Sequence, residues 1–318
     1  MREDGASCPD ACVLCESGAT RILFQAEECR TPRPGYGWLT SDPLARKKVP
    51  PVVRCRVCGF SFRVGWSESD VHAVYREMKN TAYGRWEEDA RCTARRMLNL
   101  LHRATGGRQG TLLDVGCGAG YFADEARRVG WEVQGLEPSR YAVEIAVSEL
   151  GLQVQRGEIE DFKPPGKRYD AVTAFEVLEH LVNPVGAVGR IYDLLKPRGV
   201  FLATTPNAGS VFARILGRRW WYLEEGHLYY FTRAHLAKLL ETCGLDVFVL
   251  RGYLKKSASV AYLIHKLCAE AKWVNGLAKI AERSSWLSGL RVRPYFDEIV
   301  ALGKKRSGGR PSMSDLGV

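Results

Sequence analysis

The sequence predicts an α/β protein, an open sheet with helices on both faces, preceded by a small cysteine module. Residues 112–115 are apolar except for Asp114 and predict a short buried strand, and a helical pattern begins at residue 121. Three glycines at alternate positions join the two. They are Gly116, Gly118 and Gly120. A second strand, residues 131–136, ends in Glu137, about 20 residues after Asp114. Two Cys-x-x-Cys pairs near the N-terminus indicate the separate module.

The glycine loop predicts a site where the backbone closely approaches a ligand. A dinucleotide site needs Gly-x-Gly-x-x-Gly, but the third position is Tyr121, so the spacing is Gly-x-Gly-x-Gly. The acid Asp114 stands two residues before the first glycine, where it favours a ligand with a free ammonium over a pyrophosphate. A tight Rossmann-like turn that binds no such ligand is the alternative.

These residues resemble motif I of the class I S-adenosylmethionine (SAM)-dependent methyltransferases. The resemblance continues through residues 169–180, which are similar to the fourth strand and the start of its helix, and through residues 194–200 and 204–207 around the fifth strand. Arg198 stands where the family usually has Gly. The match is best to the branch of the ubiquinone-pathway O-methyltransferases and their bacterial relatives. The resemblance implies a Rossmann-like seven-stranded sheet whose last strand, near residues 298–303, is antiparallel.

The family's motif positions imply a set of SAM-binding residues. Asp114 is expected to hold the methionine end and Glu137 the ribose, while Glu160 falls at the adenine edge. The full set is Asp114, Gly116, Cys117, Gly118, Gly120, Glu137, Pro138, Glu160, Phe175 and Glu176.

Methyl transfer from a sulfonium is an in-line displacement, so most of the catalysis comes from positioning the acceptor. A base is needed only for a protonated nucleophile, and histidine is the usual choice. His180 follows the fourth strand at the ligand-binding edge of the sheet. In the resembling O-methyltransferases, the residues matching Glu176, Glu179 and His180 are associated with a divalent cation. Local hydrogen bonding at the helix start is the alternative.

His227 lies in an aromatic segment, residues 220–232, predicted to cross the cofactor mouth. Aromatic walls around one titratable group suit a planar or apolar acceptor. We therefore expect His227 and Tyr230 to be catalytic candidates, with a packed core histidine as the alternative. If Glu224 and Glu225 lie beside His227, they would raise its pKa.

The cysteine pairs predict a structural zinc site. Two knuckles supply the four thiolate ligands of a tetrahedral Zn²⁺ with no open position. The ligands are Cys12, Cys15, Cys55 and Cys58. A redox pair, or knuckles without metal, are the alternatives. N-terminal zinc modules also recur in the branch that the chain resembles.

The expected domain organisation is a zinc-knuckle module (1–65), a helical cap (66–104), a methyltransferase domain (105–304) and a disordered tail (305–318). Residues 255–290 form a helical insertion, expected as a lid or a membrane-surface element. The sequence has no run of 18 apolar residues and no secretory signal at its N-terminus, so we expect a cytoplasmic protein without a membrane span.

The predicted function is methyl transfer from SAM to a small-molecule acceptor, with oxygen favoured. The net charge of +10 also suits an anionic partner, so RNA or a nucleotide sugar is an alternative acceptor. Nucleic acid is not favoured, because the Asn/Asp-Pro-Pro-Tyr signature of base N-methylation is missing after the fourth strand. A catalytically silent SAM-binding partner subunit is the alternative from another class.

Overall fold

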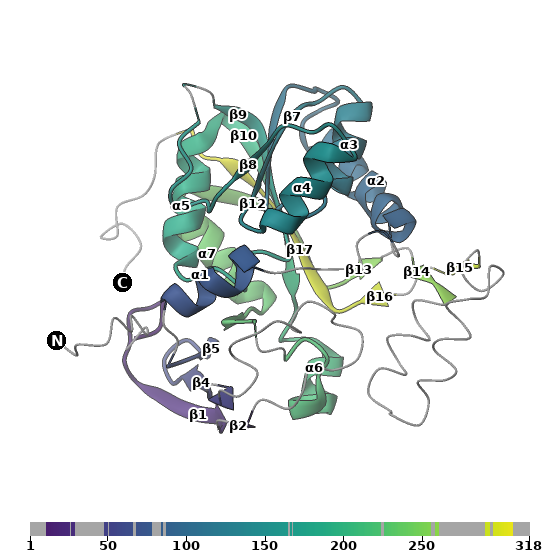
Figure 1. Cartoon of the computed structure of the whole chain (residues 1–318). Coiled ribbons are helices and arrows are strands. Elements are labelled where there is room, and N and C mark those ends of the chain that lie inside the picture. The colour runs from purple at the N-terminus through teal and green to yellow at the C-terminus, as the bar shows by residue number, and fades with distance from the viewer. Residues whose placement is uncertain are drawn as a thin grey trace.

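A seven-stranded sheet forms the centre of the protein (Figure 1). The structure is a computed structural model that describes residues 11–25, 27–28, 48–49, 51–65, 68–77, 84, 87–164, 166, 168–223, 226–255, 258–260, 290–292 and 295–307. The strands, in chain order, are β6 (Thr111–Val115), β7 (Glu132–Glu137), β8 (Val154–Arg156), β9 (Tyr169–Phe175), β10 (Leu195–Pro206), β12 (Leu245–Arg251) and β17 (Glu298–Lys305). Their spatial order is β12-β17-β10-β9-β6-β7-β8, and β17 is antiparallel to both of its neighbours.

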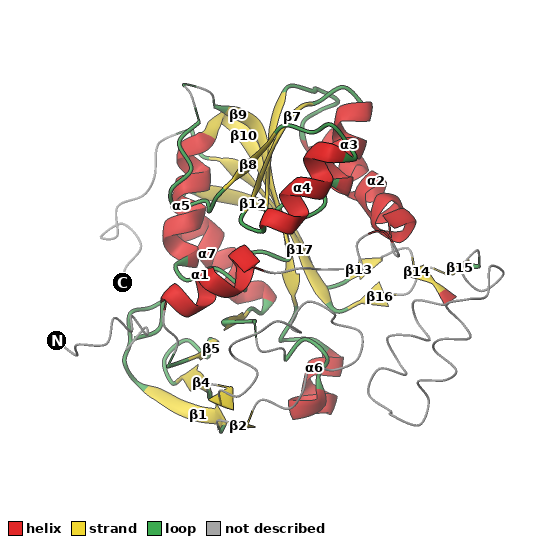
Figure 2. Ribbon diagram, viewed as in Figure 1, coloured by secondary structure: helices red, strands yellow, loops and turns green. Residues whose placement is uncertain are grey.

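Helices cover both faces of this sheet (Figure 2). One layer contains α2 (Glu87–Ala104), α3 (Tyr121–Arg128) and α4 (Arg140–Ser148), and the other contains α5 (Pro184–Leu194) and α7 (Arg233–Thr242). Successive residues of a strand point to opposite faces. Accordingly, Leu112 packs in the apolar cluster of α2 and α3, and Leu113 packs in that of α5 and α7.

Local signals start three of these helices. The side chains of Ser139, Asn183 and Thr232 each accept a backbone N–H three residues later, which satisfies one of the unpaired donors of a first turn. Pro184 occupies the first turn of α5, where no N–H donor is needed.

A second, four-stranded sheet lies below the large one in Figure 1. Its order is β1 (Thr20–Phe24), β4 (Val52–Cys55), β5 (Ser61–Arg63) and β11 (Tyr229–Tyr230). The hairpin of β1 and β4 is extended by β2 (Glu27–Glu28) and β3 (Lys48–Val49). Between the sheets lies α1 (Glu68–Glu77). The remaining elements are α6 (Val211–Leu216), the 3-10 turn η2 (Gly217–Arg219), and two short pairs, β13 (Leu254–Lys255) with β16 (Tyr295–Phe296) and β14 (Ala258–Ser259) with β15 (Arg291–Val292).

The seven-stranded sheet and its antiparallel last strand confirm the predicted fold class. The third strand ends at Arg156, and residues 157–161 form the loop after it. Two details differ from the prediction. Residues 176–183 form a turn instead of starting a helix, because Pro184 and the Asn183 cap set the start of α5. The last strand continues to Lys305, whose ammonium donates to the carbonyls of Tyr192 and Leu195.

The predicted helical insertion and tail fall largely on residues 261–289 and 308–318, outside the described residues. Within the part of the chain that the structure describes, no helix is long and apolar enough to cross a membrane.

Candidate functional site

The glycine loop leaves β6 at the carboxyl edge of the sheet. Gly116 and Gly120 have φ angles of +67° and +86°, which side chains disfavour. A Cβ at Gly116 would lie 2.5 Å from Val177, and one at Gly120 would lie 2.4 Å from Leu152. The chain therefore needs glycine at both positions. Because the Val177 side chain lies this close to Gly116, the turn after β9 packs directly against the glycine loop.

Two buried carboxylates flank this loop. Asp114 is 2% exposed and accepts a hydrogen bond of 2.7 Å from the Thr173 hydroxyl of the neighbouring strand β9. Burial raises the pKa of Asp114 to about 7, the Thr173 hydrogen bond opposes this, and the nearby Glu137 adds to it. Asp114 is therefore placed to gain from a cationic ligand.

Glu137 is held by backbone donors. Its two carboxylate oxygens accept the N–H of Gly118 and the N–H of Ser139, both at 2.9 Å. Burial raises the pKa of Glu137, and the two backbone donors oppose this. Each oxygen keeps a second lone pair, so the fixed carboxylate can still accept hydrogen bonds from ligand hydroxyls.

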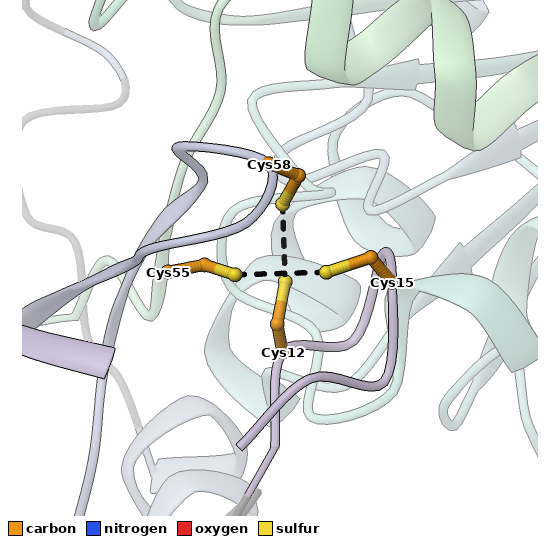
Figure 3. Close-up of side chains that lie close together, drawn as sticks. All are labelled: Cys12, Cys15, Cys55 and Cys58. Atoms are coloured by element: carbon orange, nitrogen blue, oxygen red, sulfur yellow. Dashed lines mark hydrogen bonds between the residues drawn. The ribbon is translucent and has the colours of Figure 1, made fainter. Parts of the chain in front are cut away.

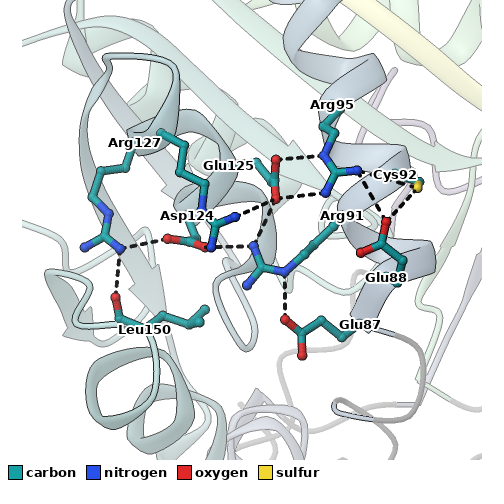
Figure 4. A network of polar contacts seen from close by, with 10 residues as sticks. Glu87, Glu88, Arg91, Cys92, Arg95, Asp124, Glu125, Arg127 and Leu150 are labelled. Atoms are coloured by element: carbon teal, nitrogen blue, oxygen red, sulfur yellow. Dashed lines mark hydrogen bonds and ion pairs between the residues drawn. The ribbon is translucent and has the colours of Figure 1, made fainter.

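A buried ion-pair network fixes the helix that follows the loop (Figure 4). Arg91 of α2 lies 2.7 Å from Asp124 and 3.0 Å from Glu125 on α3, and its guanidinium stacks 5.3 Å from the Tyr121 ring centre. Arg95 lies 2.9 Å from Glu125. These pairs attach α2 to α3, the helix that begins at the glycine loop.

The loop after β8 carries the predicted adenine-edge residue Glu160, which is exposed. Buried Ile159 and Phe162 anchor the loop. The adjacent Glu158 pairs with Arg76 at 2.9 Å and with His72, both on α1. Helix α1 therefore covers this end of the predicted cofactor site.

The turn after β9 contributes Glu179 and His180 to a group of three side chains, and the segment just before β11 contributes the third, His227. Their potential ligand atoms lie within 4.8 Å of one another. The two imidazole rings meet edge to face with centres 4.6 Å apart. Glu179 is 1% exposed, and neither of its carboxyl oxygens has a hydrogen-bond partner among the described residues. A buried carboxylate without a partner is costly, so the group is suited to a cation or a polar ligand.

Backbone carbonyls orient both imidazoles. The Nδ1 of His180 lies 2.9 Å from the Gly226 carbonyl, with Tyr75 contacting both groups, and the Nδ1 of His227 lies 2.8 Å from the Tyr222 carbonyl. A carbonyl only accepts, so both rings donate from Nδ1 and keep the Nε2 lone pair.

Burial keeps these imidazoles neutral. It lowers the pKa of His180 to about 4 and the pKa of His227 well below its usual value. Glutamates beside His227 would shift its pKa upward, opposite to this direction. Burial of the His227 ring and the neighbouring His180 lower its pKa, while Glu224 and Glu225 lie outside the described residues. Burial and Glu176 raise the pKa of Glu179.

The other predicted site residues are distributed around this core. Glu176 has a φ of +55° and accepts a hydrogen bond of 3.0 Å from Thr204, and it is not one of the three grouped side chains. Phe175 meets Phe122 edge to face, with 4.6 Å between ring centres. Pro138 and Cys117 lie on the loops beside Glu137 and Gly118. Tyr230 packs in a separate apolar cluster with Val52, Trp220 and Tyr222.

One residue near the histidines was not singled out by the sequence, Arg63, which contacts the His227 carbonyl. Tyr75 contacts His180, and the sequence had placed it on a helix whose aromatic residues either face the active site or pack against the core. Arg63 could have been suspected from its place directly after Phe60, Ser61 and Phe62, since a charge is unusual in a buried strand.

The four predicted zinc ligands lie together (Figure 3). The sulfur atoms of Cys12 and Cys58 are 3.5 Å apart, and those of Cys15 and Cys55 are 3.6 Å apart. A tetrahedral zinc with bonds of about 2.3 Å requires sulfur–sulfur distances of about 3.8 Å. The four thiols therefore have the number, type and spacing that a structural zinc needs.

Comparison with known proteins agrees with the class that the fold and the glycine-loop site define, a Rossmann-like methyltransferase. The family described as "Methyltransferase domain" matches residues 86–249, about half of the chain, and the protein belongs to this family. Residues 86–249 are therefore a methyltransferase domain.

The relatives found include ubiquinone biosynthesis O-methyltransferases. The one from Alkalilimnicola ehrlichii is 34% identical over 148 residues, 42% of this chain and 59% of the relative. The one from Methylobacterium nodulans is 33% identical over 154 residues, 45% of this chain and 62% of the relative. The chain thus spans about three fifths of the length of these relatives. Similar solved structures include a putative methyltransferase from Bacillus halodurans, with a TM-score of 0.48 and 17% identity over 66% of this chain and 98% of that one.

Proposed function

We propose that the protein transfers the methyl group of SAM to a hydroxyl oxygen of a small-molecule acceptor. The observation that carries this proposal is the buried group of Glu179, His180 and His227 beside the glycine loop. Val177 packs against Gly116, and the backbone N–H of His180 donates to the Val177 carbonyl at 2.9 Å. One short turn therefore connects the glycine loop to this group. The names of the relatives, which specify O-methylation, support the same chemistry.

In this proposal Asp114 binds the ammonium of SAM and Glu137 its ribose hydroxyls. The acceptor lies at the histidines, where its oxygen can be held in line with the methyl group. The strongly lowered pKa of His227 makes it a weak proton acceptor, so an unaided general base is the less favourable role.

The same features suit a divalent cation. Two neutral imidazoles with free Nε2 lone pairs and one carboxylate form a common transition-metal ligand set, and the Nδ1–carbonyl contacts orient the rings as in metal sites. A bound cation would supply Lewis acidity that lowers the pKa of an acceptor hydroxyl. We therefore propose Glu179, His180 and His227 as ligands and acceptor-positioning residues. We also propose a separate structural zinc at the four cysteines.

The test is product formation from isotopically labelled SAM and a panel of phenols and alcohols, with mass spectrometry locating the methyl group. We expect O-methylated products, and His227→Ala should lower turnover roughly 10²-fold, the cost of a misplaced acceptor, with nearly unchanged SAM affinity. The exposed His102 provides the matched control, His102→Ala. Methylation only at nitrogen or carbon, or normal turnover in His227→Ala, would contradict the proposal.

A further inference from the structure

The cysteine module and the methyltransferase domain share one sheet. Strand β5 follows the second cysteine pair, and it pairs antiparallel with β11, which begins two residues after His227. Tyr229 lies opposite Phe62, and Tyr230 lies opposite Ser61. The segment that carries His227 is therefore the start of a strand added to the module's sheet.

Arg63 forms the most direct link between the two parts. It is 5% exposed, its backbone N–H donates to the Leu228 carbonyl at 2.8 Å, and its Nε donates to the His227 carbonyl at 3.1 Å. Its guanidinium also lies 5.8 Å from the Tyr230 ring centre. From the other side, the Leu228 N–H donates to the Glu179 carbonyl at 2.8 Å. The His227–Leu228 backbone is thus held between Arg63 and the turn that bears Glu179.

The knuckle turn itself is attached to the methyltransferase domain. The Cys58 carbonyl lies 3.0 Å from the Nε2 of His235 on α7. Phe60, fully buried, packs on the rings of His235, Phe231 and Tyr229 with centres 5.1 to 5.9 Å away. A change in the knuckle would therefore be transmitted through rigid, packed groups to the strand that follows His227.

We propose that the four-cysteine module holds the backbone of His227 in place and that Arg63 is the positioning residue through which it does so. This inference rests on the proposed function for the role of His227. Metal in the knuckle holds β5 in place, and Arg63 then fixes the backbone from which His227 reaches Glu179 and His180. A module that only stabilised the fold would not need a buried arginine bound to this carbonyl.

The test compares Arg63→Met with Arg54→Met in the full, zinc-loaded chain. Arg54 lies on the adjacent strand β4 and bonds Ser61 at 3.2 Å, so it serves as a control from the same sheet. We expect Arg63→Met to lower kcat roughly 10- to 100-fold, the cost of a small misplacement in an active site, while SAM affinity and zinc content stay within about twofold. Arg54→Met should leave all three unchanged.

A second readout does not depend on activity. In ¹⁵N-histidine-labelled protein, the ring signals of His227, assigned with His227→Ala, should shift in Arg63→Met and on removal of zinc by a chelator, but not in Arg54→Met. If Arg63→Met does not fold, Arg63→Lys is measured instead and should give smaller changes in the same direction.

Unchanged His227 signals in the Arg63 variant would overturn the inference, as would an unchanged kcat in an enzyme that His227→Ala inactivates. If the proposed function is wrong, the result is different: His227→Ala stays fully active, while the ring signals of His227 still shift in Arg63→Met.

Discussion

Lowering the pH from 7.5 to 6 is expected to weaken SAM binding about sixfold, because protonation of Asp114 outweighs the fuller protonation of the α-amino group of SAM. Burial raises the pKa of this carboxyl to about 7 in the ligand-free protein. About three quarters of the molecules then carry ionised Asp114 at pH 7.5, and about one tenth do at pH 6. An ammonium ligand binds the ionised form, so its affinity rises with pH through 7. Above about pH 8 the α-amino group of SAM itself loses its proton, and affinity declines again.

Isothermal titration calorimetry measures this directly. At pH 7, SAM binding should release about half a proton, seen as a dependence of the binding enthalpy on the ionisation enthalpy of the buffer. Methylthioadenosine is the matched control ligand, because it keeps the adenosine part but lacks the amino acid. Its affinity should be nearly constant over this range, and SAM binding to Asp114→Asn should be weak and nearly independent of pH. A constant SAM affinity in the unaltered protein, or the same slope for methylthioadenosine, would refute the assignment of Asp114.

Three further outcomes are expected. Glu137→Ala should weaken SAM binding at least about tenfold in calorimetry, because hydrogen bonds to a charged group are worth about 1.5–3 kcal/mol each; an unchanged affinity would exclude a ribose contact. Metal analysis should find about one zinc per chain, lost in Cys55→Ser, whereas a metal-free protein with a fully folded module would contradict the zinc site. Arg91→Met should reduce the free energy of unfolding by about 1–3 kcal/mol, since it removes the buried guanidinium that Asp124 and Glu125 share and leaves them only their more exposed partners Arg127 and Arg95, while Arg140→Met, which removes an exposed pair, should change it little. Equal melting curves for these two variants would show that the buried network adds no stability.

Local patterns allowed much of the fold to be predicted. The run ending in Asp114, its glycines and the strand ending at Glu137 are signals contained within a few residues, and the structure has the corresponding strands and turn. The four cysteines were predictable for the same reason, since each pair forms its own tight turn.

The neighbourhood of the histidines was harder to predict, because it is made by contacts between distant segments. Arg63 and His227 are 164 positions apart. The strand β11, which joins the segment of His227 to the module, is two residues long and therefore too short to leave a periodic pattern. The direction of the His227 pKa shift depends on the burial of its ring, which sequence neighbours do not reveal. Within the turn after β9, Glu179 joins the histidines, whereas Glu176 has a left-handed backbone and accepts a hydrogen bond from Thr204 instead.

The pairing of β5 with β11 also has a consequence for synthesis of the chain. The cysteine knuckles leave the ribosome well before residues 229–230 exist, so the nascent module presents β5 as an open edge until most of the methyltransferase domain has been made. An open strand edge is a template for pairing with another chain. Contacts between distant residues also form slowly. The module is therefore most exposed to aggregation during translation, and its cysteines are least protected from oxidation in the same interval. Adequate zinc supply during expression should raise the yield of folded protein more than zinc added after purification.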